Sequence, residues 1–229
     1  VVNIDKAVSK ENNILLKDFK RNNNYKFIKE NIGNKNKICN ILKIYKPECI
    51  INFAAETHVD YSISNPNKTI KNNIIDTLKF YDEVLKYWSN LDKKMKNKLK
   101  IIQISTDEVY GSLKKSQKSF TEKSLIKPNN PYSASKASIE NFLRSYYKTY
   151  GLPVIITRCS NNFGPGQKKD KFIPKSIICI LKNKKIPLFG DGTQIRDWIY
   201  VSDHCKAIIK IIKKGKIGEI YNIGSSNLF

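Results

Sequence analysis

The sequence has few of the residues that build disulfide frameworks, zinc sites or membrane spans. Its five cysteines are widely spaced, odd in number and form no Cys-x-x-Cys pair. A disulfide framework and a zinc site are therefore not expected. Apolar runs are short, and even the isoleucine-rich segment 208–212 is flanked by lysines, so no segment is long enough to cross a bilayer. We expect a soluble protein with reduced thiols.

Acidic residues and arginine are scarce beside lysine. Lys and Arg number 42 against 20 Asp and Glu, which gives a formal net charge of +22, yet only four of the basic residues are Arg. Lys, Asn and Ile make up 97 of the 229 residues, as AT-rich codons would produce. A nucleic-acid surface more often concentrates its charge and uses Arg on phosphates. We interpret the charge as a solvated surface; a basic nucleic-acid-binding protein or an inactive remnant is the alternative from another class.

The rest of the chain alternates short apolar runs with longer helical segments, which is the pattern of a doubly wound parallel α/β sheet. The run at 1–5 ends in Asp5, as the second strand of a dinucleotide-binding fold does where its carboxylate meets the adenosine ribose. Asp5 fits an ordinary turn as well. Strands are expected at residues 1–5, 49–54, 99–105, 153–157, 186–188 and 219–223, and helices at 35–45, 67–88, 131–150, 172–182 and 202–213. The charged stretch 91–100 is expected to be a helix end or a loop.

The helix at 131–150 is framed especially well. Asn130 suits its N-cap, Pro131 its first turn and Gly151 its end. Tyr132 and Lys136 lie one turn apart on it, the arrangement of a proton-abstracting tyrosinate whose pKa an ammonium lowers. The same Tyr-x-x-x-Lys spacing occurs at Tyr25 with Lys29 and at Tyr110 with Lys114. The capped helix behind a polar loop favours Tyr132 with Lys136.

Polar residues end the apolar strand expected at 99–105, where Ser105, Thr106, Asp107 and Glu108 follow one another. In open α/β sheets, ligands bind at the carboxyl ends of the strands. Two neighbouring carboxyl groups in different surroundings can act as an acid and a base. A solvated turn capped by Thr106 or Asp107 explains the same residues equally well.

Seven ordered blocks make the sequence more specific. They read "INFAAETHVDYSISNP", "STDEVYG", "NPYSASKA", "RCSNNFGPGQ", "FIPKSI", "GDGTQIRDWIYVSDH" and "GEIYNIGSSN". In order and spacing they closely resemble the dTDP-glucose 4,6-dehydratase family of the extended short-chain dehydrogenase class. The resemblance implies a truncated NAD-binding, Rossmann-like domain at 1–164 and a partial nucleotide-sugar-binding region at 165–229. It also implies that the first strand, the glycine-rich turn and the end of the substrate lobe lie outside this sequence, so that the chain as given would be inactive.

The resemblance assigns roles residue by residue. Thr106 would bind the sugar 4-hydroxyl, Tyr132 would take its proton, and Lys136 would hold the nicotinamide ribose. Asp107 resembles the general acid of the elimination, and Glu108 its general base. The cofactor set would be Asp5, Asn31, Ile32, Ala54, Ala55, Glu56, Asn72, Ser105, Tyr132, Lys136 and Asn162. The substrate set would be Thr57, Thr106, Asn161, Lys171, Phe172, Pro187, Phe189 and Arg196.

Some positions depart from the family pattern or stay open. Asn31 stands where the family usually has Asp, although its carbonyl can still accept a hydrogen bond from adenine, and Asn72 replaces a usual Thr. His58 fits either a structural role or a supporting role near the site. His204 is expected to cap a helix or lie on the surface. No metal site is expected, because Asp191, Asp197 and Asp203 share no helical face.

The reaction implied by the resemblance is NAD-dependent conversion of dTDP-glucose to a 4-keto-6-deoxy sugar. A UDP-glucose 4,6-dehydratase and a nucleotide-sugar 4-epimerase are the alternatives, although an epimerase does not need the pair Asp107 and Glu108. The complete protein is expected to be a cytoplasmic homodimer with a nucleotide-sugar substrate and with no membrane or specific nucleic-acid partner. An organellar address stays open.

Overall fold

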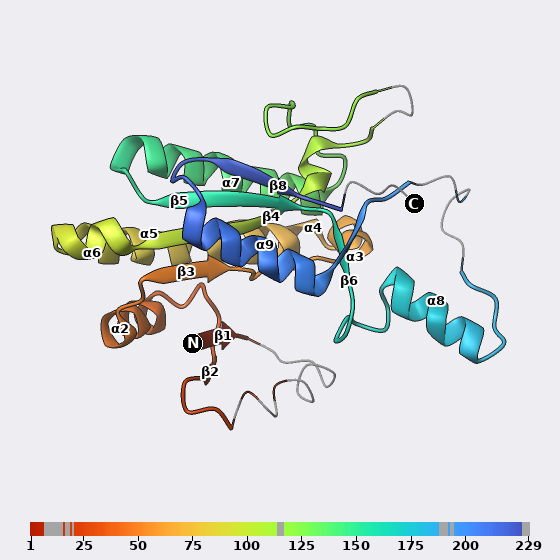
Figure 1. The fold of residues 1–229 in the computed structure, drawn as a ribbon, viewed down its shortest axis with the longest axis horizontal. Coiled ribbons are helices and arrows are strands. Elements are labelled where there is room, and N and C mark those ends of the chain that lie inside the picture. Colours follow the sequence, from red (N-terminus) through yellow and green to blue (C-terminus); the bar gives the residue numbers. More distant parts are fainter. Residues whose placement is uncertain are drawn as a thin grey trace.

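The computed structural model describes residues 1–6, 16, 19, 21–113, 117–187, 192 and 195–225. Its central sheet has four parallel strands in the order β3 (Cys49–Asn52), β4 (Lys100–Thr106), β5 (Val154–Cys159) and β8 (Ile220–Ile223). Helices cover this sheet on both faces (Figure 1). The expected parallel α/β architecture is therefore confirmed.

Two short parallel pairs lie outside the central sheet. One joins β1 (Val2–Asp5) to β2 (Lys26–Lys29), and the other joins β6 (Asn161–Phe163) to β7 (Trp198–Tyr200). We did not expect β2, β6 or β7, because β6 and β7 have only three residues and β2 has only two apolar residues, between lysines. The strand expected at 186–188 is wrong for its described part, since Ile186 and Pro187 are in no strand. Proline offers no N–H to a ladder.

The alternation of side chains along β4 and β5 divides the core into two layers. Ile101, Val154 and Ile156 pack with α2 (Lys35–Tyr45), α5 (Asp76–Ser89) and α7 (Pro131–Tyr150). Ile102 and Ile155 point to the opposite face and pack with α9 (Val201–Lys214). Neighbouring strand residues serve opposite faces, and both faces are covered, which explains why these strands are apolar throughout.

The helix expected at 67–88 is interrupted. It consists of α4 (Pro66–Ile70), the π-helical turn η1 (Lys71–Ile75) and α5. A π turn shifts the facing of the residues that follow it, and such turns often occur at functional sites. Two further short helices are α3 (Val59–Ser64) and α6 (Lys93–Lys98). The latter lies in the stretch expected to be a helix end or a loop.

Helix α7 forms as its sequence predicts. Asn130 accepts a hydrogen bond from the Ser133 N–H at 2.8 Å, Pro131 opens the first turn, and Gly151 ends the helix with a φ of 76°, which glycine adopts without strain. Helix α8 (Phe172–Leu181) projects from the sheet beyond β6 (Figure 1). Within the described ranges, no helix has both the length and the apolar character of a membrane span.

Candidate functional site

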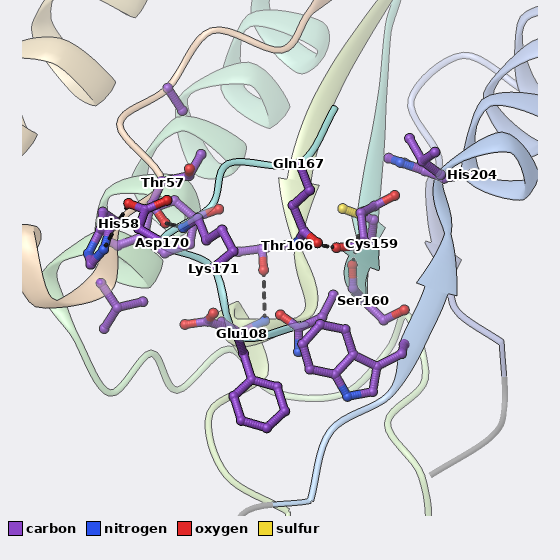
Figure 2. A pocket seen from close by; sticks show the side chains of 18 of the residues that line it. Thr57, His58, Thr106, Glu108, Cys159, Ser160, Gln167, Asp170, Lys171 and His204 are labelled. Carbon is purple, nitrogen blue, oxygen red and sulfur yellow. Dashed lines mark hydrogen bonds and ion pairs between the residues drawn. The ribbon is translucent and has the colours of Figure 1, made fainter. Parts of the chain in front are cut away.

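A cavity of about 720 Å³ opens at the carboxyl ends of β3, β4 and β5. Its walls come from four segments: the loop after β3, the end of β4, the first turns of α7, and the chain from the end of β5 to α9, including α8 (Figure 2). This is the edge of an α/β sheet where ligands bind. Predicted site residues that line the cavity are Ala55, Thr57, Ser105, Thr106, Glu108, Tyr132, Lys136, Asn161, Asn162, Lys171, Phe172 and Pro187.

Strand β4 and the turn that follows it bring three polar residues to the cavity lining: Ser105, Thr106 and Glu108. The strand ends at Thr106, and the 3-10 turn η2 (Asp107–Tyr110) follows at once. The Thr106 hydroxyl accepts from the Glu108 N–H at 3.2 Å and donates to Asp107 Oδ1 at 3.3 Å. Thr106 therefore caps the turn, as one interpretation expected, and also lines the cavity, as the other did.

The two carboxyl groups on η2 have different surroundings. Burial raises the pKa of Asp107 to about 6, and the charge of Glu108 adds to this, while Thr106 and the Arg196 guanidinium act in the opposite direction. Glu108 reaches the cavity and accepts a hydrogen bond from Asn130 Nδ2 at 3.0 Å. Asp107 can hold a proton up to about pH 6, which suits an acid, while Glu108 is placed to accept one.

Tyr132 and Lys136 reach the cavity from one face of α7, and both are more than nine-tenths buried. The ammonium of Lys136 donates to the Ile104 carbonyl at 2.6 Å, and burial lowers its pKa to about 8. The pKa of Tyr132 lies above its ordinary value because of burial, with Cys159 and Glu108 adding to the effect. The expectation that Lys136 lowers the pKa of Tyr132 is wrong for this structure, because burial dominates and the ammonium is engaged elsewhere.

Of the two other Tyr-x-x-x-Lys pairs, the described residues Tyr25, Lys29 and Tyr110 do not line this cavity. Tyr25 accepts from Asn3 Nδ2 at 2.9 Å, beside β1. Tyr110 is buried, and its hydroxyl accepts from Arg158 at 2.8 Å and donates to Asn222 at 2.7 Å. Lys114 lies outside the described residues. Helix context thus selects the pair that reaches the cavity.

Several residues of the predicted cofactor and substrate sets lie away from the cavity lining. Asp5 ends β1, and Asn31 and Ile32 follow β2. Ala54 and Glu56 flank Ala55 in the loop after β3. Asp107 precedes Glu108 on η2, and Arg196 is close enough to act on the pKa of the Asp107 carboxyl. Phe189 lies outside the described residues.

The side-chain amide of Asn31 stabilises a tight turn through both its oxygen and its nitrogen. Its Oδ1 accepts from the Gly33 N–H at 2.9 Å, and its Nδ2 donates to the buried Asp76 at 3.1 Å. A Cβ at Gly33 would lie 2.6 Å from Asp76 Oδ1, so the turn requires glycine for this close approach. One lone pair of the Asn31 carbonyl remains for another donor.

Neither the predicted Asn72 nor its neighbour Asn73 on the π turn lines the cavity, but the Asn73 side chain joins two segments that do. The Asn73 side chain accepts from the Glu56 N–H at 2.7 Å and donates to the Glu56 carbonyl at 3.0 Å. It also donates to Ser135 Oγ at 3.0 Å. The buried amide of Asn73 therefore links the loop after β3 to helix α7. This contact could not be predicted from the sequence, because a regular helix was expected at this position.

Two contacts cross between the loop after β3 and the segment before α8. Lys171 Nζ donates to the Thr57 carbonyl at 3.4 Å, and His58 Nε2 lies 3.7 Å from Asp170 (Figure 2). His58 Nδ1 also accepts from the Tyr61 N–H at 3.5 Å and caps α3. The same tautomer can make both contacts. His58 therefore has a structural role and also lines the cavity.

His204 was expected to cap a helix or lie on the surface, and this is wrong. It is 5% exposed, lines the cavity, and its Nε2 has no hydrogen-bond partner among the described residues. Burial lowers its pKa. The spacing of His204, Ile208 and Ile211 along α9 matches one buried stripe of a helix and was the signal available in the sequence.

Other lining residues also escaped the sequence analysis, among them Cys159, Ser160, Gln167 and Ser176. Cys159 ends β5, Ser160 and Gln167 follow it, and Ser176 lies on α8, but nothing in their residue types marked them as site residues. Several buried polar atoms of the lining have no partner within the described segments: Ser105 Oγ, Ser160 Oγ, Asn162 Oδ1, Gln167 Oε1 and Ser176 Oγ. Such atoms are costly unless a ligand or water binds them. In the same segments, no group of three or more His, Cys, Asp or Glu side chains is placed to hold a metal ion.

Comparisons with known proteins agree with the resemblance seen in the sequence blocks. The family model for GDP-mannose 4,6 dehydratase matches residues 1–228. A dTDP-glucose 4,6-dehydratase of Xanthomonas campestris is 41% identical over 227 residues, which are 99% of this chain and 64% of that protein. One of Haemophilus influenzae is 43% identical over 226 residues, 99% of this chain and 67% of that protein. The chain thus spans about two thirds of the length of these relatives.

Solved structures give the same picture. The dTDP-glucose 4,6-dehydratase of Bacillus anthracis, in complex with NAD, matches with a TM-score of 0.87 and 41% identity over 100% of this chain and 67% of that one. The UDP-glucuronic acid 4-epimerase of Bacillus cereus matches with a TM-score of 0.86 and 29% identity over 100% of this chain and 70% of that one. Because the family model covers nearly the whole chain and relatives above 40% identity cover 99% of it, the chain belongs to the GDP-mannose 4,6 dehydratase family.

Proposed function

We propose that the protein containing this chain is a dTDP-glucose 4,6-dehydratase, which converts dTDP-glucose to dTDP-4-keto-6-deoxyglucose. The relatives of highest identity named above carry this activity in their names. The observation that carries the proposal is the meeting of two groups at one cavity: Tyr132 with Lys136 from α7, and Glu108 from η2, where Asp107 precedes it just outside the lining. A 4-epimerase needs the first group only, so the second group favours a dehydratase.

NAD is the proposed cofactor. The solved relative from Bacillus anthracis is in complex with NAD. The lining of this chain fits a polar ring and ribose, because Ser105 Oγ and Asn162 Oδ1 are buried without partners in the described segments and the Lys136 ammonium lies at the same wall. Bound NAD would accept a hydride from C4 of the sugar and return it to C6. Asp5, at the carboxyl end of β1, is the proposed partner of the adenosine ribose.

The side chains divide the proton transfers among them. Tyr132 takes the proton of the sugar 4-hydroxyl, which Thr106 also binds, and Lys136 holds the ribose beside it. Once C4 is a carbonyl, the C5 proton is acidic, and Glu108 removes it and returns a proton to C5 when the hydride reaches C6. Asp107 has a pKa of about 6, so it stays protonated at higher pH than an ordinary carboxyl. It gives a proton to the departing 6-hydroxyl.

The diphosphate of the substrate needs cations. Lys171 reaches the cavity mouth and is the proposed point charge for it, while Arg196 supplies a guanidinium whose fork matches phosphate oxygens. Asn161, Phe172 and Pro187 complete the lining on the same side and are proposed to hold the nucleotide. The homodimer and the cytoplasmic location expected from the resemblance stay predictions, which light scattering and cell fractionation would test.

The proposal is tested by giving the intact protein dTDP-glucose and UDP-glucose separately and identifying the products by mass spectrometry. Loss of one water from dTDP-glucose is expected. Inversion at C4 without loss of water would show that the protein is an epimerase and not a dehydratase. A preference for UDP-glucose would show that its substrate carries uracil and not thymine. In Glu108→Gln, stopped-flow absorbance should show NADH accumulating with little product, and product at the unmutated rate would refute the assignment of Glu108.

A further inference from the structure

Asn130 joins two parts of the site through one side chain. Its Oδ1 accepts from the Ser133 N–H at 2.8 Å and caps helix α7. Its Nδ2 donates to Glu108 Oε2 at 3.0 Å, on the turn that follows β4. The Ser133 hydroxyl locks the cap from the other side through the Asn130 N–H and carbonyl, at 3.3 and 3.0 Å. The amide plane is therefore held at both ends.

The cap alone does not explain asparagine at this position. Ser, Asp and Asn cap helices about equally well. Of these three, only Asn offers a hydrogen-bond acceptor to the helix and an N–H donor to a carboxylate at the same time. A neutral donor also leaves the charge of Glu108 in place, which a lysine or arginine partner would offset. Asparagine at position 130 is therefore explained by its contact with the Glu108 carboxylate together with its role as a helix cap.

The contact sets the geometry between the two chemical groups of the cavity. Asn130 stands two residues before Tyr132, so the amide that holds one oxygen of Glu108 belongs to the same rigid helix start. Among the described residues, the other oxygen of Glu108 has no hydrogen-bond partner, and Glu108 lines the cavity. The titratable groups that the described residues place close to Glu108 are the Asp107 carboxyl on its own turn and the Tyr132 hydroxyl from α7.

We propose that Asn130 is a positioning residue for Glu108. It fixes the carboxylate at a set distance from Tyr132, so that a sugar whose 4-hydroxyl meets Tyr132 presents its C5 hydrogen to Glu108. This inference rests on the proposed dehydratase function. It adds to that function a residue that touches neither sugar nor cofactor and acts through the carboxylate it holds.

The test uses three variants of the intact protein. Asn130→Ser keeps a cap acceptor and removes the donor to Glu108. Asn130→Asp keeps the cap and places a second carboxylate beside Glu108. The matched control is Asn34→Ser, because Asn34 caps α2 in the same way, through the Lys37 N–H, and does not line the cavity. Single-turnover measurements follow C4 oxidation by NADH absorbance and elimination by release of deuterium from C5 and by product formation.

In Asn130→Ser, elimination should slow on the order of 10- to 100-fold, as expected for a lost hydrogen bond to a charged group, while C4 oxidation changes by less than about 3-fold. In Asn130→Asp, elimination should slow further. Its rate should also need a higher pH, because the added carboxylate disfavours ionisation of Glu108. Asn34→Ser should change neither step nor the pH profile.

The outcomes separate this inference from the proposed function. If the unmutated protein neither reduces NAD nor releases water from dTDP-glucose, the proposed function fails. If it makes product and Asn130→Ser eliminates at an unchanged rate, or loses C4 oxidation and elimination equally, the role of Asn130 is wrong and the proposed function stands. Should Asn130→Ser fail to fold, Asn130→Asp decides, and an unshifted pH profile there overturns the inference.

Discussion

Replacing Asp107 by asparagine should stabilise the protein at neutral pH while it slows the chemistry. The pKa of Asp107 is raised from its ordinary 3.8 to about 6, mainly because the carboxyl is buried next to Glu108. Between these two values the folded protein binds more protons than the unfolded chain. Stability therefore falls as the pH rises through this window, and the full cost of the ionised carboxylate is present above pH 6.

The size of the effect follows from the shift. Two pKa units at about 1.36 kcal/mol each give a cost of about 3 kcal/mol at pH 8 and about 1.5 kcal/mol at pH 5. Asparagine has nearly the same shape, and its carbonyl can still accept from the Thr106 hydroxyl, which lies 3.3 Å from Asp107 Oδ1. Asp107→Asn should therefore raise the free energy of unfolding, and by more at pH 8 than at pH 5.

Urea unfolding of the intact protein at the two pH values measures this difference. Asp203→Asn is the control, because Asp203 is exposed and, within the described part of the chain, forms its ion pair with Lys206 on the surface of α9, at 2.9 Å. Its free energy of unfolding should change by less than about 1 kcal/mol at either pH. A loss of stability in Asp107→Asn at pH 8, or a gain that does not grow with pH, would refute the reasoning. The same variant should eliminate water about 10²- to 10⁴-fold more slowly.

Three further results are expected. Tyr132→Phe should slow C4 oxidation by about 10²- to 10⁴-fold, while Tyr25→Phe, outside the cavity, should leave it nearly unchanged; equal losses in stopped-flow absorbance would mean that the wrong pair was chosen. Glu140→Ala should lower the free energy of unfolding by about 3–5 kcal/mol, because Arg158, 2% exposed, loses a partner at 2.6 Å. Urea unfolding should then show a smaller loss in the double variant Glu140→Leu with Arg158→Met, and an equal loss would contradict this. Fluorescence anisotropy should show weak duplex DNA binding that falls steeply with salt and has no sequence preference; tight, selective binding at physiological salt would overturn our interpretation of the charge.

Local signals were enough to predict much of the scaffold. The bounds of α2 and α7 agree with the predicted helices, because caps, a first-turn proline and a terminal glycine act within a few residues of the chain. The long apolar runs became β4 and β5 for the same reason. The strands β6 and β7 have only three residues, and the two apolar residues of β2 lie between lysines, so these strands are defined by their partners and could not be seen in the sequence.

The sequence by itself determined which chemical groups the protein carries and the order in which they occur, so that Thr106, Glu108 and Tyr132 could be named before their positions were known. Only the tertiary structure decided how those groups behave. Burial raises the pKa of Tyr132 and lowers that of Lys136, and the fold turns His204 into the cavity. The reason is physical: residue type sets the chemistry of a side chain locally, whereas desolvation and hydrogen bonding depend on segments far apart in sequence that only folding brings together.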